Sequence, residues 1–303
     1  MNSKKKVGIA LGCGTARGFA HIGVLKVLED ENIPINYIAG SSIGAIVGTL
    51  YALGYGAYEI EKMASDFGLK RMAFVSNPSF SGSGLLEGRT IEKILKPIIG
   101  HRTFEDLKIP LKIVSTDICS GEEVIFTDGL LLKALRASAS FPGLFVPMKY
   151  NNTYLVDGGL INPVPANIVK RMGAECVIAV DVTRNVKDYT RFMRQKKEKN
   201  IKTETDKDSA SNVSVNWLSS FDVLLQRNKQ WVPNIVNVLL QTVYIAEQKI
   251  ADSQLHSTHI DVAISPDLGH FTMFDFKKAH QIIHCGEKAA KDKLPVLLNA
   301  LSR

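Results

Sequence analysis

The sequence predicts an α/β protein with three layers, α/β/α, around a mainly parallel central sheet. The chain has 303 residues, of which 45% are hydrophobic and 22% are charged, so it can bury a continuous core. Strand-like and helix-like patterns alternate from the first residues onward, and such alternation produces right-handed βαβ units with helices on the faces of a parallel sheet. Short apolar runs such as Val7–Leu11 are typical of strands that are buried on both sides.

The first 55 residues contain the clearest alternation. Ile22, Leu25 and Leu28 recur at helical spacing after a loop of small residues, so a helix is expected there. The expected elements are, in order, a strand at Val7–Leu11, a loop at Gly12–Gly18, a helix that ends near Glu29–Asn32, a strand at Tyr37–Ala39, a turn at Gly40–Gly44 and a helix at Ala45–Leu53.

Later elements follow the same logic of apolar runs bounded by turn residues. Asn77–Gly88 is rich in serine and glycine, which favours a mobile loop over the sheet. The other expected elements are strands at Leu111–Cys119, Val124–Phe126, Tyr154–Val156, Cys176–Val182 and Asp261–Ile264, and helices at Leu130–Ser138, from Pro163 to Met172, at Phe221–Leu255 and at Lys277–Leu301.

Residues 32–58 contain no charged side chain and reach the length of a membrane-spanning helix. The stretch also contains Pro34, Asn36 and five glycines, which a helix in lipid would accommodate poorly. A buried strand, a tight turn and a buried helix fit the same residues better.

We expect a single domain over residues 1–303, with a polar and basic insertion at about residues 184–216. Within it, Lys187–Lys202 carries seven basic residues and only two acidic ones. A solvated insertion without a partner is the simpler interpretation, because charge runs usually have none. A basic flap that touches anionic lipid is the alternative.

The charge balance and the cysteines restrict the class of protein only loosely. The net charge of +7 favours anionic surfaces in general. The four cysteines are far apart and form no CxxC pair, so we expect reduced thiols and no metal site. The N-terminus lacks the long apolar segment of a signal peptide. These features together predict a cytoplasmic protein without a cofactor.

The strongest local motif is Gly40-Ser41-Ser42-Ile43-Gly44, which matches the nucleophile-elbow pattern G-x-S-x-G. Small residues two positions before and after the serine let neighbouring backbone approach a strained strand-to-helix turn. Ser42 also falls at a helix N-terminus, which favours developing negative charge. Ser42 is therefore the candidate nucleophile, although Ser41 or Ser42 could also be a plain helix cap.

A serine nucleophile needs a base, and Asp157 is the favoured candidate. It follows an expected strand and precedes Gly158 and Gly159, which permit close approach of another segment. Asp181 is the second choice, and Asp117 and Asp128 are weaker rivals. A histidine-dependent α/β-hydrolase stays open as well, because the chain has seven histidines.

The Gly12–Gly18 loop joins a strand to a helix, so its backbone amides could hold an oxyanion. Its glycine spacing also approximates a dinucleotide-binding fingerprint. That interpretation requires an acidic residue at the end of the second strand, where this chain has Ala39 and Gly40. We therefore reject nucleotide binding.

The order of loop, Ser42 elbow and Asp157-Gly158-Gly159 resembles the patatin-like phospholipase family, in its small bacterial single-domain branch. The likeness extends to Ala20–Leu25, Arg136-Ala137-Ser138 and Asn162–Pro165. It implies a patatin-like fold and hydrolysis of lipid acyl esters by a Ser–Asp dyad, Ser42 and Asp157, without histidine. It also implies an oxyanion hole or substrate-binding loop at Cys13, Gly14, Thr15, Arg17 and Gly18, with motif support from Gly40, Gly44, Gly158 and Gly159.

The chain departs from the family in this loop, because Cys13 and Thr15 replace two of the three glycines of G-G-G-x-R/K-G. If either position needs φ > 0, strain follows, and it is greater at the β-branched Thr15. Two functions are therefore carried forward: a serine esterase acting on phospholipids or lysophospholipids, and an acyl-lipid binding or regulatory protein with a weakened site. The expected partners are an acyl lipid and an anionic membrane surface at the inner face of the membrane, and no nucleic acid is expected.

Overall fold

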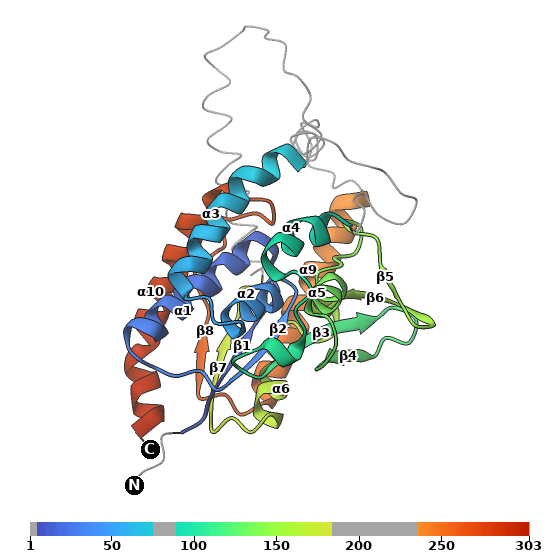
Figure 1. Ribbon diagram of the computed structural model, residues 1–303. Helices are drawn as coiled ribbons and strands as arrows, with labels where there is room; N and C mark the ends of the chain where they lie inside the picture. The colour runs from blue at the N-terminus through green and yellow to red at the C-terminus, as the bar shows by residue number, and fades with distance from the viewer. Residues whose placement is uncertain (1–4, 75–88, 184–234, 303) are drawn as a thin grey trace, which may run out of the picture.

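The computed structural model describes residues 5–74, 89–183 and 235–302. Within these ranges a sheet of eight strands lies between two layers of helices (Figure 1). The strands are ordered β5-β6-β3-β2-β1-β7-β8, and β4 also pairs with β3. The structure thus confirms the three-layer α/β/α architecture.

The parallel half of the sheet carries the chain's most buried residues. Every residue of β1 and β7 is buried, as expected for strands covered on both faces. β1 lies between β2 and β7, and all neighbouring strands in this half run parallel. Its members are β1 (Val7–Leu11), β2 (Tyr37–Ser41), β3 (Leu111–Asp117), β7 (Cys176–Val180) and β8 (Val262–Ile264).

The antiparallel half is built on β3. β4 (Glu123–Phe126) pairs with residues 113–116 of β3, a stretch that overlaps the pairing regions of both β2 and β6. β2 and β6 (Thr153–Asp157) therefore share the other edge of β3, one after the other. β5 (Met148–Tyr150) pairs with β6 at the end of the sheet.

Two separate hydrophobic clusters cover the two faces of the sheet. Ile9 and Leu11 of β1 belong to the larger cluster, whereas Ala10 between them belongs to the smaller one, so large and small side chains alternate along the strand. The larger cluster contains α1 (Ala20–Asp30), α2 (Ile43–Ala52), α3 (Ala57–Phe74), α4 (Arg89–Ile99), α5 (Leu131–Ser138) and α10 (Ala279–Ser302), and the smaller one contains α6 (Ala166–Arg171) and part of α9 (Ile235–Ser257).

The expected elements agree with the structure to within a few residues, with some differences. The Gly12–Gly18 loop ends in a short 3₁₀ helix at Thr15–Phe19. α6 begins at Ala166 rather than Pro163, after Pro165 as its cap. The helices α3 and α4 and the strand β5 were not predicted. Three short 3₁₀ helices were not predicted either, at Phe104–Asp106, Gly158–Leu160 and Phe276–Lys278.

The loop predicted at residues 77–88, the insertion at 184–216 and the first part of the helix expected from residue 221 lie outside the described residues. In the described ranges, no helix combines the length and the hydrophobicity needed to cross a membrane. The uncharged stretch 32–58 contains β2, α2 and the start of α3, in agreement with the strand, turn and helix predicted for it.

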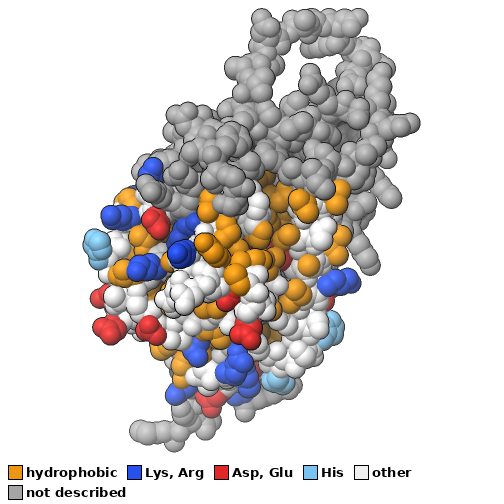
Figure 2. All heavy atoms as spheres, turned by 90° about the vertical axis from the view of Figure 1, so that its right-hand side faces the viewer, with side chains coloured by type: hydrophobic (Ala, Val, Ile, Leu, Met, Phe, Trp, Pro, Cys, Tyr) orange, Lys and Arg blue, Asp and Glu red, His pale blue; other side chains and the backbone are white. Residues whose placement is uncertain are grey.

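Hydrophobic side chains are not spread evenly over the described surface. Seen from the right-hand side of Figure 1, they gather in the upper centre of the face, and most Lys, Arg, Asp and Glu side chains lie around that area (Figure 2). Apolar surface areas of this kind often serve as contact sites.

Candidate active site

Ser42 occupies a strained turn between β2 and α2. Its φ of 55° and ψ of −122° lie outside the regions that a non-glycine residue ordinarily adopts. The glycines on either side permit this turn: a Cβ on Gly40 would lie 2.6 Å from the backbone of Ala45, and one on Gly44 would overlap the carbonyl oxygen of Leu11. The backbone thus has the geometry that the G-x-S-x-G motif predicts.

Asp157 meets Ser42 at hydrogen-bonding distance. Ser42 Oγ donates to Asp157 Oδ2 at 2.6 Å, across 115 residues of sequence. The strand register on β3 explains why Ser42 and Asp157 are close. Ser41 at the end of β2 pairs with Val114, and Asp157 at the end of β6 pairs with the next residue of β3, Ser115. β3 therefore aligns two strands so that their last residues face each other.

The end of α5 and the segment that follows it hold Ser42 and Asp157 in place. Ser138 Oγ accepts a hydrogen bond from the Ser42 amide at 2.9 Å, and the Ser140 carbonyl accepts one from the Asp157 amide at 3.1 Å. The Arg136 guanidinium in turn donates to Ser140 Oγ and, at 2.5 Å, to the Val146 carbonyl. The resemblance to the family includes Arg136-Ala137-Ser138, and these hydrogen bonds give the motif a supporting role.

The environment of Asp157 opposes its ionisation. The side chain is buried, and burial raises the pKa of Asp157 to about 7, against the lowering effect of hydrogen bonds from Ser42 and the Gly159 amide. The two glycines after it allow tight packing: a Cβ on Gly158 would overlap the Val114 carbonyl, and one on Gly159 would lie 2.6 Å from Cys13 Sγ.

The Gly12–Gly18 loop is fixed by its own backbone and by neighbouring segments. The Cys13 amide donates to the Pro163 carbonyl at 2.8 Å, and the Arg17 amide donates to the Gly14 carbonyl at 3.2 Å. The amides of Gly14 and Thr15 have no acceptor among the described residues. These two amides, rather than those of Cys13 and Arg17, are therefore available as donors to an anion.

Thr15 adopts the left-handed conformation that its family position suggested, with a φ of 53°. Its Oγ1 donates to the Gly14 carbonyl at 2.7 Å, a local hydrogen bond that offsets part of the strain. Cys13, the other replaced glycine, has no positive φ. Gly18 lets this segment lie against Ile43, because a Cβ there would overlap the Ile43 side chain.

Arg17 lies beneath the loop and does not reach the solvent. Its Nε donates weakly to the Gly14 carbonyl at 3.4 Å, and its guanidinium lies 5.6 Å from the centre of the Tyr244 ring. Burial lowers the pKa of Arg17, while nearby acidic groups, Glu247 among them, act in the opposite direction.

Glu247 on α9 is a buried carboxyl that no sequence motif indicated. A Cβ on Gly159 would lie 3.0 Å from Glu247 Oε1, so the carboxyl borders the segment that follows Asp157. Burial raises the pKa of Glu247 to about 8, and the charge of Asp157 adds to this shift. Only the fold brings this residue to the site.

Among the described residues no histidine contacts Ser42, and none lines the cavity beside it. His21 is fully buried, its Nε2 donates to the Gly12 carbonyl at 2.8 Å, and burial lowers its pKa to about 4. It therefore supports the Gly12–Gly18 loop. The rival aspartate Asp181 is bonded to the amide of Thr183. Within the described ranges, no cluster of His, Cys, Asp and Glu could hold a metal ion.

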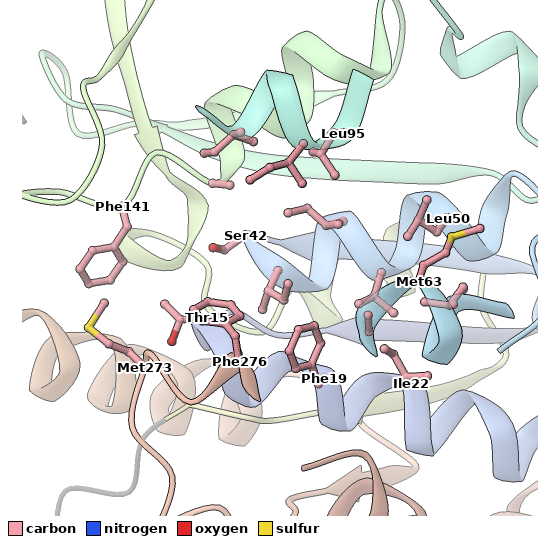
Figure 3. Close-up of a pocket in the computed structure, with 18 of the residues that line it drawn as sticks. Thr15, Phe19, Ile22, Ser42, Leu50, Met63, Leu95, Phe141, Met273 and Phe276 are labelled. Atoms are coloured by element: carbon pink, nitrogen blue, oxygen red, sulfur yellow. The ribbon is translucent and has the colours of Figure 1, made fainter. Parts of the chain in front are cut away.

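Ser42 opens into an apolar cavity of about 1070 Å³, the open mouth included. Figure 3 shows Ser42 and Thr15 in its wall, with Phe141 and Met273 to one side and Leu50 and Met63 to the other. Ser42 and Thr15 are the only polar residues among those described in its lining. The others are Phe19, Ile22, Ile43, Ile46, Val47, Leu50, Ile60, Met63, Ala64, Ile91, Ile94, Leu95, Ile98, Ala139, Phe141, Leu144, Phe145, Met273, Phe274 and Phe276.

Comparison with known proteins places this geometry in a family. The family model of patatin-like phospholipases matches residues 9–170, which is more than half of the chain and includes the loop, Ser42 and Asp157. The chain belongs to the patatin-like phospholipase family. VipD from Legionella pneumophila has the same fold, with a TM-score of 0.54 at 12% identity over 97% of this chain and 67% of that one.

Several relatives have NTE or patatin-like phospholipase in their names. An uncharacterised NTE family protein of Mycobacterium tuberculosis is 36% identical over 181 residues, which are 60% of this chain and 50% of that protein. Lysophospholipase NTE1 of Debaryomyces hansenii is 30% identical over 96% of this chain and 18% of its own length. Human patatin-like phospholipase domain-containing protein 6 is 28% identical over 94% and 20%. The chain therefore spans half or less of the length of these relatives.

Proposed function

We propose that this protein is a serine esterase that hydrolyses acyl esters of phospholipids or lysophospholipids through an acyl-enzyme. The observation that carries the proposal is the 2.6 Å hydrogen bond from Ser42 Oγ to Asp157 Oδ2 at the wall of an apolar cavity. A hydroxyl bonded to a buried carboxylate is activated as a nucleophile, and the cavity can hold an acyl chain. The lysophospholipase and phospholipase names of the relatives support the same class of reaction.

The reaction proceeds in two steps at one serine. Ser42 Oγ attacks the ester carbonyl carbon while Asp157 takes the hydroxyl proton, and this proton then passes to the departing alcohol oxygen as the ester bond breaks. Water attacks the acyl-enzyme in the second step, with Asp157 taking its proton and returning it to Ser42 as the fatty acid leaves. In each step the amides of Gly14 and Thr15 are the proposed donors to the oxyanion.

The alternative is an acyl-lipid binding or regulatory protein with a weakened site. The observation that favours it is the left-handed Thr15, a strained residue in the loop that would hold the oxyanion. Loss of one such donor costs about 10²–10³ in rate. The dyad hydrogen bond is intact in this structure, which favours the esterase.

Replacement of Ser42 tests the proposal. We expect Ser42→Ala to lower hydrolysis of a short p-nitrophenyl ester by about 10⁴-fold or more, and to remove labelling by a fluorophosphonate, while the protein stays folded. Ser41→Ala is the matched control, because Ser41 Oγ donates to the Asn162 carbonyl and does not reach Asp157. A fully active Ser42→Ala protein would end the proposal, and a wild type that is not labelled would favour the binding protein.

A second assay, with lysophospholipid in vesicles, tests the expected membrane contact. Lysophospholipid presented in anionic vesicles should be cleaved faster than in zwitterionic vesicles, because the chain is basic and has an apolar surface area (Figure 2). Equal rates on the two surfaces would remove anionic contact from the proposal and leave the esterase in place.

A further inference from the structure

The cavity beside Ser42 has a length that helix α2 defines. Five residues at the start of this helix and along one face line it, at positions i, i+1, i+4, i+5 and i+8. They are Ser42, Ile43, Ile46, Val47 and Leu50. Ser42 is at one end of this row and Leu50 is at the other, as Figure 3 shows.

The end of the cavity near Leu50 is closed by the protein. Leu50 and Leu95 are each 5% exposed and Ile60 is 1% exposed, although all three line the cavity. Met63 lies beside Leu50 in the same wall (Figure 3). A chain that starts at Ser42 and follows α2 therefore meets buried side chains at Leu50.

The helical rise converts this row of residues into a distance. Leu50 is eight residues beyond Ser42, which at the α-helical rise corresponds to about 12 Å. An extended hydrocarbon chain of about ten carbon atoms covers that distance, since each bond of about 1.5 Å advances it by slightly less than its length. Ile46 is half-way along, at about 6 Å from Ser42, or about five carbons.

We propose that α2 acts as a ruler for the acyl group, with Leu50 as the stop that sets a preferred length of about ten carbons. The inference rests on the proposed function, because it names the acyl group that Ser42 would receive. The apolar wall has no polar group between Ile43 and Leu50 that could bind a shorter, hydrophilic acyl group. Every methylene that enters adds apolar contact until the chain reaches Leu50.

Esters from acetyl to palmitoyl test the ruler on the wild-type protein. We expect kcat/KM to rise by about three- to fourfold per added methylene up to the stop, and to level off or fall beyond it. A profile without a preferred length would overturn the inference.

Substitutions along α2 test which residue sets the limit. Ile46→Phe should move the preferred length to about five carbons, Leu50→Phe should shorten it slightly, and Leu50→Ala should lengthen it. Leu111→Ala is the matched control for Leu50→Ala, because Leu111 is equally buried, on β3, but does not line the cavity. It should lower stability without a change of preferred length. Preferred lengths that stay constant across the folded α2 variants would overturn the inference.

Fatty-acid binding separates failure of the ruler from failure of the esterase. The rise in Tm that saturated fatty acids of increasing length produce in the Ser42→Ala protein should level off near ten carbons, and Leu50→Ala added to Ser42→Ala should move that point outward. This pattern, combined with a wild-type protein that cleaves no ester, would support the ruler and end the esterase proposal. Ester cleavage combined with length-independent fatty-acid binding would overturn the ruler and leave the esterase.

Discussion

Asp157 is a carboxyl whose surroundings suit the task of a base near neutral pH. An aspartate with an ordinary pKa of about 3.9 accepts a proton only weakly at that pH. Burial raises the pKa of Asp157 to about 7 and outweighs the two hydrogen bonds that stabilise its charge. A general base is most effective when its pKa is close to the working pH, so this burial makes a dyad without histidine chemically reasonable.

The activity should therefore depend on pH through Asp157. Only the ionised carboxylate can take the Ser42 proton, so kcat/KM should rise with pH, reach half its maximum near pH 7 and fall about tenfold per unit below that. Rates measured from pH 5 to 9 in buffers of constant ionic strength check this. Asp157→Asn, which keeps the shape of the side chain, should remove the activity across the range. An acid limb centred near pH 4 would contradict the raised pKa.

Single residues show how much of the site the sequence could predict. Ser42 and Asp157 were identified because each stands among small residues after a strand, a local signal, and the structure brings them together. The strain at Thr15 followed from its β-branched side chain at a glycine position. Glu247 carried no such signal, because its carboxyl reaches the site only through the packing of α9, 90 residues beyond Asp157.

At the scale of elements, the positions of the strands could be predicted from the sequence better than the pairing between them. Each predicted strand is an apolar run between turn residues, and those runs are visible locally. That β2 and β6 meet along one edge of β3 depends on pairing between distant segments, which no local pattern contains. α4 was missed although Ile91, Ile94, Leu95 and Ile98 recur at helical spacing, a signal that Pro97 weakens within the same stretch.

Helices α1 and α10 pack through a pair of glycines. A Cβ on Gly23 would overlap the Ile283 carbonyl, and a Cβ on Gly286 would overlap the Ala20 carbonyl, so each glycine admits the backbone of the other helix. Lys26 of α1 joins the same region through ion pairs to Glu287 at 2.5 Å and to Glu61 of α3 at 2.7 Å. The outer helix layer thus depends on close backbone contact.

Gly286→Ala should therefore destabilise the protein, although alanine is the better helix former. Alanine at an open helical site gains up to about 1 kcal/mol over glycine, whereas overpacking of a close contact costs about 1–3 kcal/mol, so the expected sum is a loss. Urea unfolding followed by circular dichroism measures it. Gly56→Ala is the control, because a Cβ there has no atom nearer than 3.8 Å. Equal or greater stability of Gly286→Ala would contradict the close packing.

At the scale of the whole molecule, different helices supply different parts of the site. The layer that contains α2, α3 and α4 builds the apolar cavity. α9 brings Glu247 towards Asp157 and places Tyr244 beside Arg17. The sheet presents the dyad at the point where its parallel and antiparallel halves meet on β3. Ionisable groups are consequently buried where the two halves join, and their burial costs stability.

The cost of burying Glu247 should be visible in the pH dependence of the unfolding free energy. Burial raises the pKa of Glu247 from its usual value near 4.5 to about 8, so between these values the folded protein holds a proton that the unfolded chain has released. A raised pKa of this kind stabilises the fold at low pH, and the stabilisation is lost as pH rises towards 8. Glu247→Gln removes the titration and keeps the shape. The difference in unfolding free energy, variant minus wild type, should increase by about 1–2 kcal/mol between pH 6.5 and pH 8.

Urea unfolding of both proteins at several pH values in this window measures that difference. His21, whose pKa burial lowers to about 4, takes up a proton on unfolding at the lower end of this window, but it does so in both proteins and therefore cancels in their difference. Glu105→Gln is the matched control, because it makes the same substitution at an exposed glutamate. If the Glu247→Gln and wild-type curves ran parallel, Glu247 would be ionised in the folded protein throughout. The charge of Glu247 would then help to balance the buried charge of Arg17.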